Sequence, residues 1–430
     1  NVITTGLFSG TVDFDPGAGV LNLSDVPLGD YAIYVAKQDP TGNLVWARDF
    51  VGVDVQRGVS VTTDSQNNVY VTGNYRFTVD FDPGDGITTL TPNGDWDVFV
   101  LKLNPDGEFV WAKSLGGDES DSGKSVSVDS TGNVYIAGVF GWTADFDPGP
   151  GVTILDAGTG TAAFVTKLDS SGALVWARNV DGRSEAASLA LDDQGGVYVT
   201  GFYRNAADFD PGEGVTELTA DDHSAFFWKL NSDGHLVWAR PLQGTDTVKG
   251  VSIAVDNSGY IYSTGFFTDD ADFDPESGVA TLTSSGDYDV YLVKLNLSGS
   301  LEWARSFGSN NGGDLGYSIA FDDGGNVYAT GHFERTADFD PGEGVTEITS
   351  SGDIDVFVVK FDSSGNLVWV KSLGGSGSDF GKAITLDGDG NVYVTGDFEQ
   401  GADFDSGPGE EIVSGRGIYV WKLGFAQNLN

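Results

Sequence analysis

Short apolar segments recur along the whole chain, and each is bounded by glycine, aspartate, asparagine or serine. One set comprises residues 318–322, 326–331, 355–361 and 366–371. These segments are rich in β-branched and aromatic residues, which is typical of strands. The turns at 323–325 and 362–365 contain a glycine, as hairpin connections require. Because no segment combines a helical period with capping residues, the pattern predicts an antiparallel, helix-free unit of four strands.

The tripeptide Asp-Phe-Asp shows that this unit is repeated. It occurs seven times and begins at Asp13, Asp80, Asp145, Asp208, Asp272, Asp338 and Asp403, so that successive copies lie 63 to 67 residues apart. Four-stranded units repeated in this way are typical of radially arranged propeller blades. The fold class predicted is therefore all-β, a seven-bladed β-propeller of four-stranded antiparallel blades. One domain is expected over 1–430, with repeat units at about 1–57, 58–123, 124–186, 187–249, 250–315, 316–380 and 381–430.

The first and last blades are predicted to be incomplete. Residues 2–6 match a second strand, and the third strand at 418–423 is followed by no tryptophan-bearing fourth strand. The sequence thus contains seven second strands but six first strands and six fourth strands. Either the termini are truncated, or strands from a neighbouring chain complete these blades in a self-assembled oligomer.

A tryptophan recurs in the fourth strand, at Trp46, Trp111, Trp176, Trp238, Trp303 and Trp369. A large ring at a fixed repeat position is expected to fill the gap between neighbouring blades, with its indole N–H bound to a fixed acceptor. The stretch 316–331 and the endings Leu-Val-Trp-Ala/Val-Arg/Lys resemble the bacterial β-propeller repeat family of secreted and surface proteins. Residues 36–46 are similar to the tryptophan-docking motif of quinoprotein propellers. This resemblance implies the fold and an extracellular or cell-surface location in bacteria, and it leaves the activity open.

Charge narrows the choice of partners. The chain has 64 acidic and 22 basic residues, which gives a formal net charge of −42. Such a surface repels phosphate backbones, so nucleic acid is not expected as a partner. No window is long and apolar enough for a membrane-spanning helix, and membrane insertion is not expected. The absence of cysteine removes disulfides and thiolate chemistry.

The Asp-Phe-Asp carboxylates are the candidate metal ligands, because Ca²⁺ prefers several oxygen ligands from flexible loops. The set is Asp13, Asp15, Asp80, Asp82, Asp145, Asp147, Asp208, Asp210, Asp272, Asp274, Asp338, Asp340, Asp403 and Asp405. Two alternatives remain open. The carboxylates could pair with basic residues that recur in the third and fourth strands, such as Lys167 and Arg178, or they could only cap turns.

Departures from the repeat are the candidate ligand-binding positions. They comprise Trp96, Trp142, Tyr288, Asp95, Asp97, Asp287, Asp289, Asp353 and Asp355. Aromatic rings beside carboxylates suit sugar faces or basic side chains. These loops and the Asp-x-Gly segments at Asp121, Asp314 and Asp379 are expected to form one acidic face.

Catalytic signatures are weak. His223, His235 and His332 stand at unrelated repeat positions, so no histidine-centred triad is predicted. The function expected is a non-enzymatic extracellular binding or scaffold module that presents an acidic face to protein or glycan, stabilised by Ca²⁺. The alternatives are a carbohydrate-active enzyme with a carboxylate pair and a structural subunit of a surface assembly.

Overall fold

The structure is a computed structural model that describes residues 1–26, 30–276, 278–405, 409 and 411–423. The described residues form strands and turns, and no helix occurs among them. None of them belongs to a helix that could cross a membrane. An all-β, antiparallel architecture is confirmed.

Contacts divide the chain into two compact halves. The first half comprises Asn1–Val197, Ala206–Glu217 and Leu230–Val237, and the second comprises Tyr198–Asn205, Leu218–Lys229 and Trp238–Asn430. The prediction of one domain over 1–430 stays a prediction.

The first half contains the strands of the first three repeats and the first strand of the fourth. They are β1 (Val2–Phe8), β2 (Gly10–Asp13), β3 (Asn22–Val26), β4 (Ala32–Gln38), β5 (Leu44–Phe50), β6 (Gln56–Thr63), β7 (Val69–Tyr75), β8 (Val79–Asp80), β9 (Thr89–Leu90), β10 (Asp97–Leu103), β11 (Phe109–Gly117), β12 (Ser122–Val128), β13 (Val134–Asp145), β14 (Ile154–Leu168), β15 (Leu174–Asn179) and β16 (Ser184–Leu191). A three-stranded sheet has the order β1-β4-β5, and an eight-stranded sheet has the order β15-β14-β13-β11-β10-β7-β6, with β12 paired to β13.

Three strands of the fourth repeat contribute residues to both halves. They are β17 (Val197–Asp208), β18 (Glu217–Leu230) and β19 (Leu236–Gly244).

The second half contains the strands of the last three repeats. They are β20 (Val248–Val255), β21 (Ile261–Phe267), β22 (Asp270–Asp272), β23 (Thr281–Thr283), β24 (Asp289–Leu295), β25 (Leu301–Ser309), β26 (Leu315–Phe321), β27 (Val327–Asp338), β28 (Glu347–Phe361), β29 (Leu367–Gly375), β30 (Phe380–Leu386), β31 (Val392–Phe398), β32 (Ala402–Asp403), β33 (Ile412–Val413) and β34 (Gly417–Leu423). Its main sheet has the order β20-β21-β24-β25-β27-β28-β29-β32-β33, with β26 paired to β27, and a three-stranded sheet has the order β30-β31-β34.

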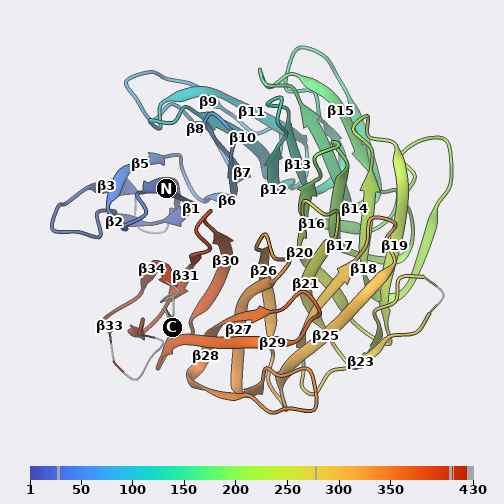
Figure 1. Cartoon of the computed structure of the whole chain (residues 1–430). Coiled ribbons are helices and arrows are strands. Elements are labelled where there is room, and N and C mark those ends of the chain that lie inside the picture. Colours follow the sequence, from blue (N-terminus) through green and yellow to red (C-terminus); the bar gives the residue numbers. More distant parts are fainter. Residues whose placement is uncertain (27–29, 277, 406–408, 410, 424–430) are drawn as a thin grey trace. The chain divides into compact units, whose positions relative to one another are not determined.

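Each complete repeat follows one pattern of pairing. In the sixth repeat β26 pairs with β27, β27 with β28 and β28 with β29, always antiparallel (Figure 1). The end of the fourth strand then pairs with the Asp-Phe-Asp hairpin of the next repeat, as where Gly374 lies opposite Asp403. Consecutive repeats within a half are therefore joined by backbone hydrogen bonds.

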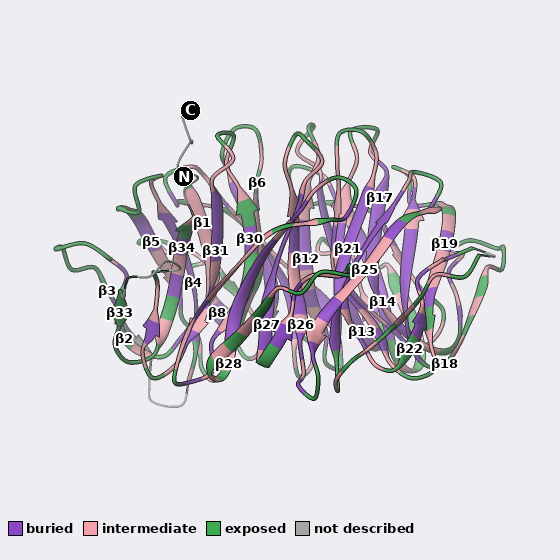
Figure 2. Ribbon diagram, turned by 60° about the horizontal axis from the view of Figure 1, so that its bottom comes forward, coloured by how far each residue is buried: buried purple, intermediate pink, exposed green. Residues whose placement is uncertain are grey.

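The core lies along the second and third strands of each repeat. In β4 and β21 nearly every residue is buried, whereas fourth strands such as β25 and the turns are more exposed (Figure 2). Continuous burial means that both faces of these middle strands are covered. Their sequences accordingly contain runs of valine, tyrosine and phenylalanine rather than a strict alternation with polar residues.

Candidate functional site

The tryptophans of the fourth strands join consecutive repeats. Their indole Nε1–H groups donate to carbonyl oxygens in the turn between the third and fourth strands of the next repeat: Trp46 to Pro105 (3.1 Å), Trp111 to Ser170 (3.2 Å), Trp176 to Ser232 (3.0 Å), Trp238 to Leu297 (3.2 Å) and Trp303 to Ser363 (3.2 Å). The predicted docking role is confirmed for these five residues. Their rings belong to the scaffold rather than to a ligand site.

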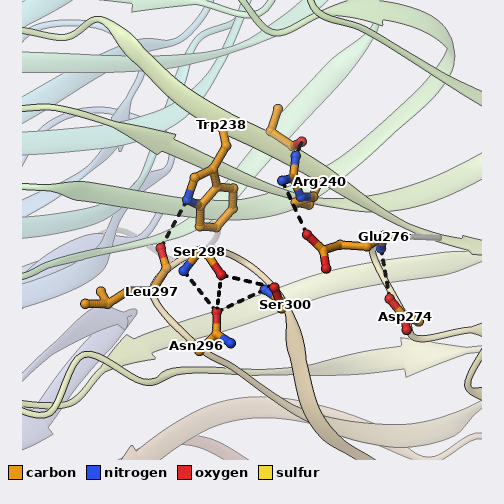
Figure 3. A network of polar contacts seen from close by, with 9 residues as sticks. Trp238, Arg240, Asp274, Glu276, Asn296, Leu297, Ser298 and Ser300 are labelled. Atoms are coloured by element: carbon orange, nitrogen blue, oxygen red, sulfur yellow. Dashed lines mark hydrogen bonds and ion pairs between the residues drawn. The ribbon is translucent and has the colours of Figure 1, made fainter. Parts of the chain in front are cut away.

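Figure 3 shows one such contact in the second half. Asn296 Oδ1 accepts the N–H groups of Ser298 and Ser300, which holds the turn whose Leu297 carbonyl receives Trp238. In the equivalent turn of the fourth repeat, Gly234 has a φ of +77°, and a Cβ added there would lie 2.9 Å from the ring of Trp176. Glycine is therefore needed both for the turn and for the close approach of the ring.

The repeated basic residues reinforce the same contact. Lys167 Nζ donates to Ser232 O at 3.3 Å, and Arg178 Nε donates to Gly234 O at 3.0 Å. Corresponding bonds run from Lys37 to Pro105, Arg48 to Gly107, Lys294 to Ser363 and Arg305 to Gly365. These cations therefore bind turn carbonyls rather than the Asp-Phe-Asp carboxylates that one of our hypotheses paired with them.

The first aspartate of every Asp-Phe-Asp loop caps that loop. In all seven copies its Oδ1 accepts two backbone N–H groups, two and eight residues further on, at 2.7–3.1 Å. The second aspartate accepts the N–H group two residues on, as Asp147 does from Gly149 at 2.8 Å. The central phenylalanine is buried in six copies. The motif thus anchors an apolar ring under a loop that two carboxylates hold by hydrogen bonds.

The described residues contain no group of three or more histidine, cysteine, aspartate or glutamate side chains arranged to hold a metal ion. The turn-capping hypothesis is supported by the hydrogen bonds, and Ca²⁺ at the Asp-Phe-Asp loops stays a prediction.

The Gly-Asp-x-Asp loops separate into exposed and buried carboxylates. Asp95, Asp287 and Asp353 are exposed, whereas Asp97, Asp289 and Asp355 begin or lie within third strands and are at most 2% exposed. The two aspartates of each loop are only two residues apart, so their difference in exposure comes from what packs over them where the loop enters the sheet. The three buried residues face the junction with the next repeat.

The aromatic candidates also differ in their surroundings. Trp142 is 57% exposed and Tyr288 is 39% exposed. Trp96 is half-buried, and the Arg57 guanidinium lies 5.7 Å from its ring centroid. The residues Trp96 and Tyr288 occupy equivalent places, because each forms a parallel bridge to the segment that enters the next repeat, whereas Trp142 belongs to another loop.

A hollow of about 520 Å³ lies in the first half, beside the loop that carries Asp95. Its lining includes Val53, Arg76, Phe77, Thr78, Pro92 and Asp95. Arg76 forms ion pairs with Asp54 at 3.3 Å and with Asp95 at 2.9 Å, and its guanidinium lies 5.3 Å from the Phe77 ring centroid. The hollow therefore combines an arginine that is paired with two carboxylates and an exposed aromatic ring, and our sequence analysis did not predict it.

Phe77 occupies a position that every repeat builds in the same way and fills differently. The residue three positions before each Asp-Phe-Asp has a positive φ of 51–69°, and these residues are Gly10, Phe77, Trp142, Asn205, Asp269, Arg335 and Gln400. The six that are not glycine are all exposed. We call this set the display position. A sequence signal was available, because seven different residue types stand there between an aromatic residue two positions before and an alanine or valine two positions after.

The protein-family comparison identifies the repeat. Residues 110–139 and 368–397 match the Beta-propeller repeat family, SBBP. The chain carries β-propeller repeats. Each matched stretch runs from a tryptophan strand through a junction into the following second strand, from β11 to β13 and from β29 to β31. The two matched stretches of this chain contain Trp111 and Asp121, and Trp369 and Asp379.

Two curated relatives are similar over most of this chain. A WD repeat-containing protein of Acanthamoeba polyphaga mimivirus is 23% identical over 438 residues, which cover 83% of this chain and 31% of that protein. Regulatory protein FlaEY of Caulobacter vibrioides is 28% identical over 348 residues, which cover 76% of this chain and 35% of that protein. The chain thus spans about a third of the length of these relatives.

Among solved structures, a protein of unknown function from Bacteroides caccae aligns with a TM-score of 0.36 and 10% identity, covering 86% of this chain and 93% of that one. Lignostilbene dioxygenase of Pseudomonas brassicacearum aligns with a TM-score of 0.31 and 12% identity, covering 84% of this chain and 88% of that one.

Proposed function

We propose that this chain is a non-enzymatic binding or scaffold module, a seven-bladed propeller that displays variable side chains beside acidic loops to a protein or glycan partner outside a bacterial cell. The display position is the observation that carries this proposal. The repeat of the Asp-Phe-Asp unit supports the number of blades, and the WD-repeat relative fits a role in binding.

The display position costs stability in six repeats. A residue other than glycine at a positive φ destabilises the fold by about 1 kcal/mol or more, and glycine would remove that cost. Only the first repeat uses glycine there. A position that keeps a strained backbone and exposes phenylalanine, tryptophan or arginine is explained by what its side chain contacts outside the chain.

The hollow beside Phe77 indicates the chemistry of a partner. Phe77 is 48% exposed and offers a ring face, while Asp54 and Asp95 offer acceptors already oriented by Arg76. A sugar can stack on the ring and donate its hydroxyls to the carboxylates, and a lysine side chain of a protein can use the same groups. The acidic surface favours neutral or basic partners.

The test is binding of a defined glycan array and a panel of lysine-rich peptides to the whole chain. We expect Phe77→Ala and Trp142→Ala to weaken binding at least tenfold at unchanged Tm. Val152→Ala is the matched control, because Val152 is 73% exposed and lies in an Asp-Phe-Asp loop. Binding that all three variants leave unchanged would refute the display position as the binding site, and turnover of a bound glycan would refute the non-enzymatic assignment.

The Ca²⁺ prediction has its own test. If Ca²⁺ binds the Asp-Phe-Asp loops, it raises the Tm over that in EDTA, and the paired substitutions Asp145→Asn and Asp147→Asn reduce the rise. An equal Tm with and without Ca²⁺ would contradict it.

A further inference from the structure

Three junctions between consecutive repeats each bury two aspartates. The pairs are Asp97 with Asp121 in the first half, and Asp289 with Asp314 and Asp355 with Asp379 in the second. All six residues are at most 2% exposed. One member begins or lies within the third strand of a repeat, and the other precedes the first strand of the next repeat. We call them the strand aspartate and the junction aspartate.

The junction aspartate has both oxygens occupied. Asp121 Oδ2 accepts the Gly117 N–H at 2.7 Å, and its Oδ1 accepts the Gly141 N–H at 3.0 Å. Asp314 and Asp379 repeat this arrangement, with Oδ2 bound to the N–H of Ser309 and Gly375 and Oδ1 bound to the N–H of Glu334 and Glu399.

The strand aspartate has one oxygen occupied and one without a partner. Asp97 Oδ2 accepts the Asn93 N–H at 3.0 Å, and Asp289 and Asp355 do the same with Ser285 and Ser351. In all three residues Oδ1 is buried and has no hydrogen-bond partner among the described residues. A buried carboxylate oxygen without a donor is costly, and here the cost recurs at three equivalent places.

In two of the three junctions the unpartnered oxygen and an oxygen of the junction aspartate lie against the same glycine, and in the third Asp355 Oδ1 lies against Gly374. A Cβ added to Gly116 would lie 2.7 Å from Asp97 Oδ1 and 2.8 Å from Asp121 Oδ2. A Cβ added to Gly308 would lie 2.5 Å from Asp289 Oδ1 and 2.9 Å from Asp314 Oδ2. Both carboxyl groups therefore face the same glycine, where a side chain has no room.

The other junctions of the same chain show that the three residues occur together. At the other three junctions, different residues replace the strand aspartate, the glycine and the junction aspartate. In that order they are Ala32, Val51 and Gln56 at the first, Ala162, Asp181 and Ser184 at the second, and Ser224, Gln243 and Val248 at the third. Each junction thus has either all three residues, the strand aspartate, the glycine and the junction aspartate, or none of them in these places. We call a junction with all three an Asp-Gly-Asp junction. This association indicates that the two carboxyl groups act as one unit.

Two adjacent carboxyl groups in a buried site cannot both be ionised without a large free-energy cost. The charged groups that act on the pairs from neighbouring elements are acidic as well: Glu119 on Asp121, and Asp397 and Glu399 on Asp379. Basic residues of the same region act on other acids: Arg76 pairs with Asp95, and Lys382 and Arg416 act on Asp397. A metal ion would need several free oxygens, and each pair has one. A proton needs only that oxygen.

We propose that each Asp-Gly-Asp junction holds one shared proton, carried on Oδ1 of the strand aspartate and donated to Oδ2 of the junction aspartate, and that it releases this proton as the solution becomes alkaline. The proton gives the unpartnered oxygen a hydrogen bond and leaves the pair with a single charge. The bond joins the third strand of one repeat to the entry of the next, so its loss loosens the junction.

The pKa of both aspartates is raised in every pair, which agrees with a proton held by the pair. The unpartnered oxygen is what places this proton on the strand aspartate. Burial raises the pKa of Asp97 to about 6 and that of Asp121 to about 7, and the charge of Asp97 adds to the shift of Asp121. Burial likewise raises the pKa of Asp314 and Asp355 to about 6. Since the folded protein binds more protons than the unfolded chain between about pH 4 and pH 7, the contribution of the pairs to stability falls as the pH rises through that range.

The test compares Asp97→Asn with Asp95→Asn in the whole chain. The asparagine side chain has the shape of the protonated acid and does not ionise. We expect Asp97→Asn to leave the Tm unchanged at pH 5 and to raise it by about 2 °C at pH 8 relative to wild type. Asp95→Asn changes an exposed carboxylate two residues away and should show no such dependence on pH. A fall in Tm at both pH values would overturn the shared proton.

A measurement on the wild-type chain keeps the proposal testable if the variant does not fold. The infrared band of a protonated carboxylic acid should be present at about pH 5.5 and should disappear by about pH 9, whereas exposed aspartates are already ionised at the lower pH. A spectrum without this band at the lower pH would refute the proposal. If Ca²⁺ raises the wild-type Tm at pH 8 and Asp97→Asn abolishes the rise, the site binds a metal instead of a proton.

Discussion

Two tryptophans of the third repeat differ in their exposure and in their role in the fold. Trp176 is 7% exposed and donates its indole N–H to Ser232 of the next repeat, while Trp142 is 57% exposed on a backbone with a φ of 51°. Trp176 stands at a position where the other complete repeats also have tryptophan, and Trp142 stands where every repeat has a different residue. The tryptophan position that docks one repeat on the next is constant in this chain, and the display position varies.

Substitution of the tryptophan at the constant position should have the largest effect on stability. Trp176→Ala removes a buried ring and the hydrogen bond to Ser232, and we expect the free energy of unfolding to fall by about 3–4 kcal/mol. Trp142→Ala removes an exposed ring and should change it by less than about 0.5 kcal/mol. Chemical denaturation of both variants tests the contrast, and equal losses would contradict it.

The Asp-Gly-Asp junction provides the second contrast. Gly116→Ala places a Cβ 2.5 Å from Asp97 Cγ, and we expect a loss of about 2 kcal/mol in the free energy of unfolding. Val51→Ala at the equivalent place of the first junction should cost less than about 0.5 kcal/mol.

Addition of Asp97→Ala to Gly116→Ala removes the clashing carboxyl group. The double variant should therefore be more stable than the sum of the two single losses predicts, in a double-mutant cycle measured by denaturation. Strict additivity would show that the glycine is not required by the aspartate.

Substitution by glycine at the display position should have the smallest effect, and it should raise the free energy of unfolding instead of lowering it. Arg335→Gly relieves a φ of 57° at an exposed side chain, and we expect the free energy of unfolding to rise by about 1 kcal/mol. Arg335→Ala keeps the strained backbone and should leave stability near that of wild type. If both variants are equally stable, the backbone at this position is not strained.

The strands, their order and the tryptophan contacts could be predicted from the sequence, because each rests on a local pattern repeated many times. The turn-capping role of the Asp-Phe-Asp carboxylates was one of three open alternatives. Their spacing to the amides that they bind is short, but sequence spacing alone does not distinguish a capped turn from a loop that binds an ion. Arg76 and Phe77 were not predicted, because they belong to no loop motif and the display position is visible only when single positions of the repeats are aligned.

Apolar periodicity and turn chemistry act within a few residues, so the repeat, the all-β architecture and the tryptophans that dock one repeat on the next can all be predicted from the amino-acid sequence. Which carboxylates are buried follows from tertiary packing. Asp95 and Asp97 are separated by a single residue, yet the first is exposed and the second is covered by the next repeat, where it meets Asp121. Burial depends on what packs over a residue from a distant part of the chain, and it is burial that turns two ordinary aspartates into a pair with a shared proton.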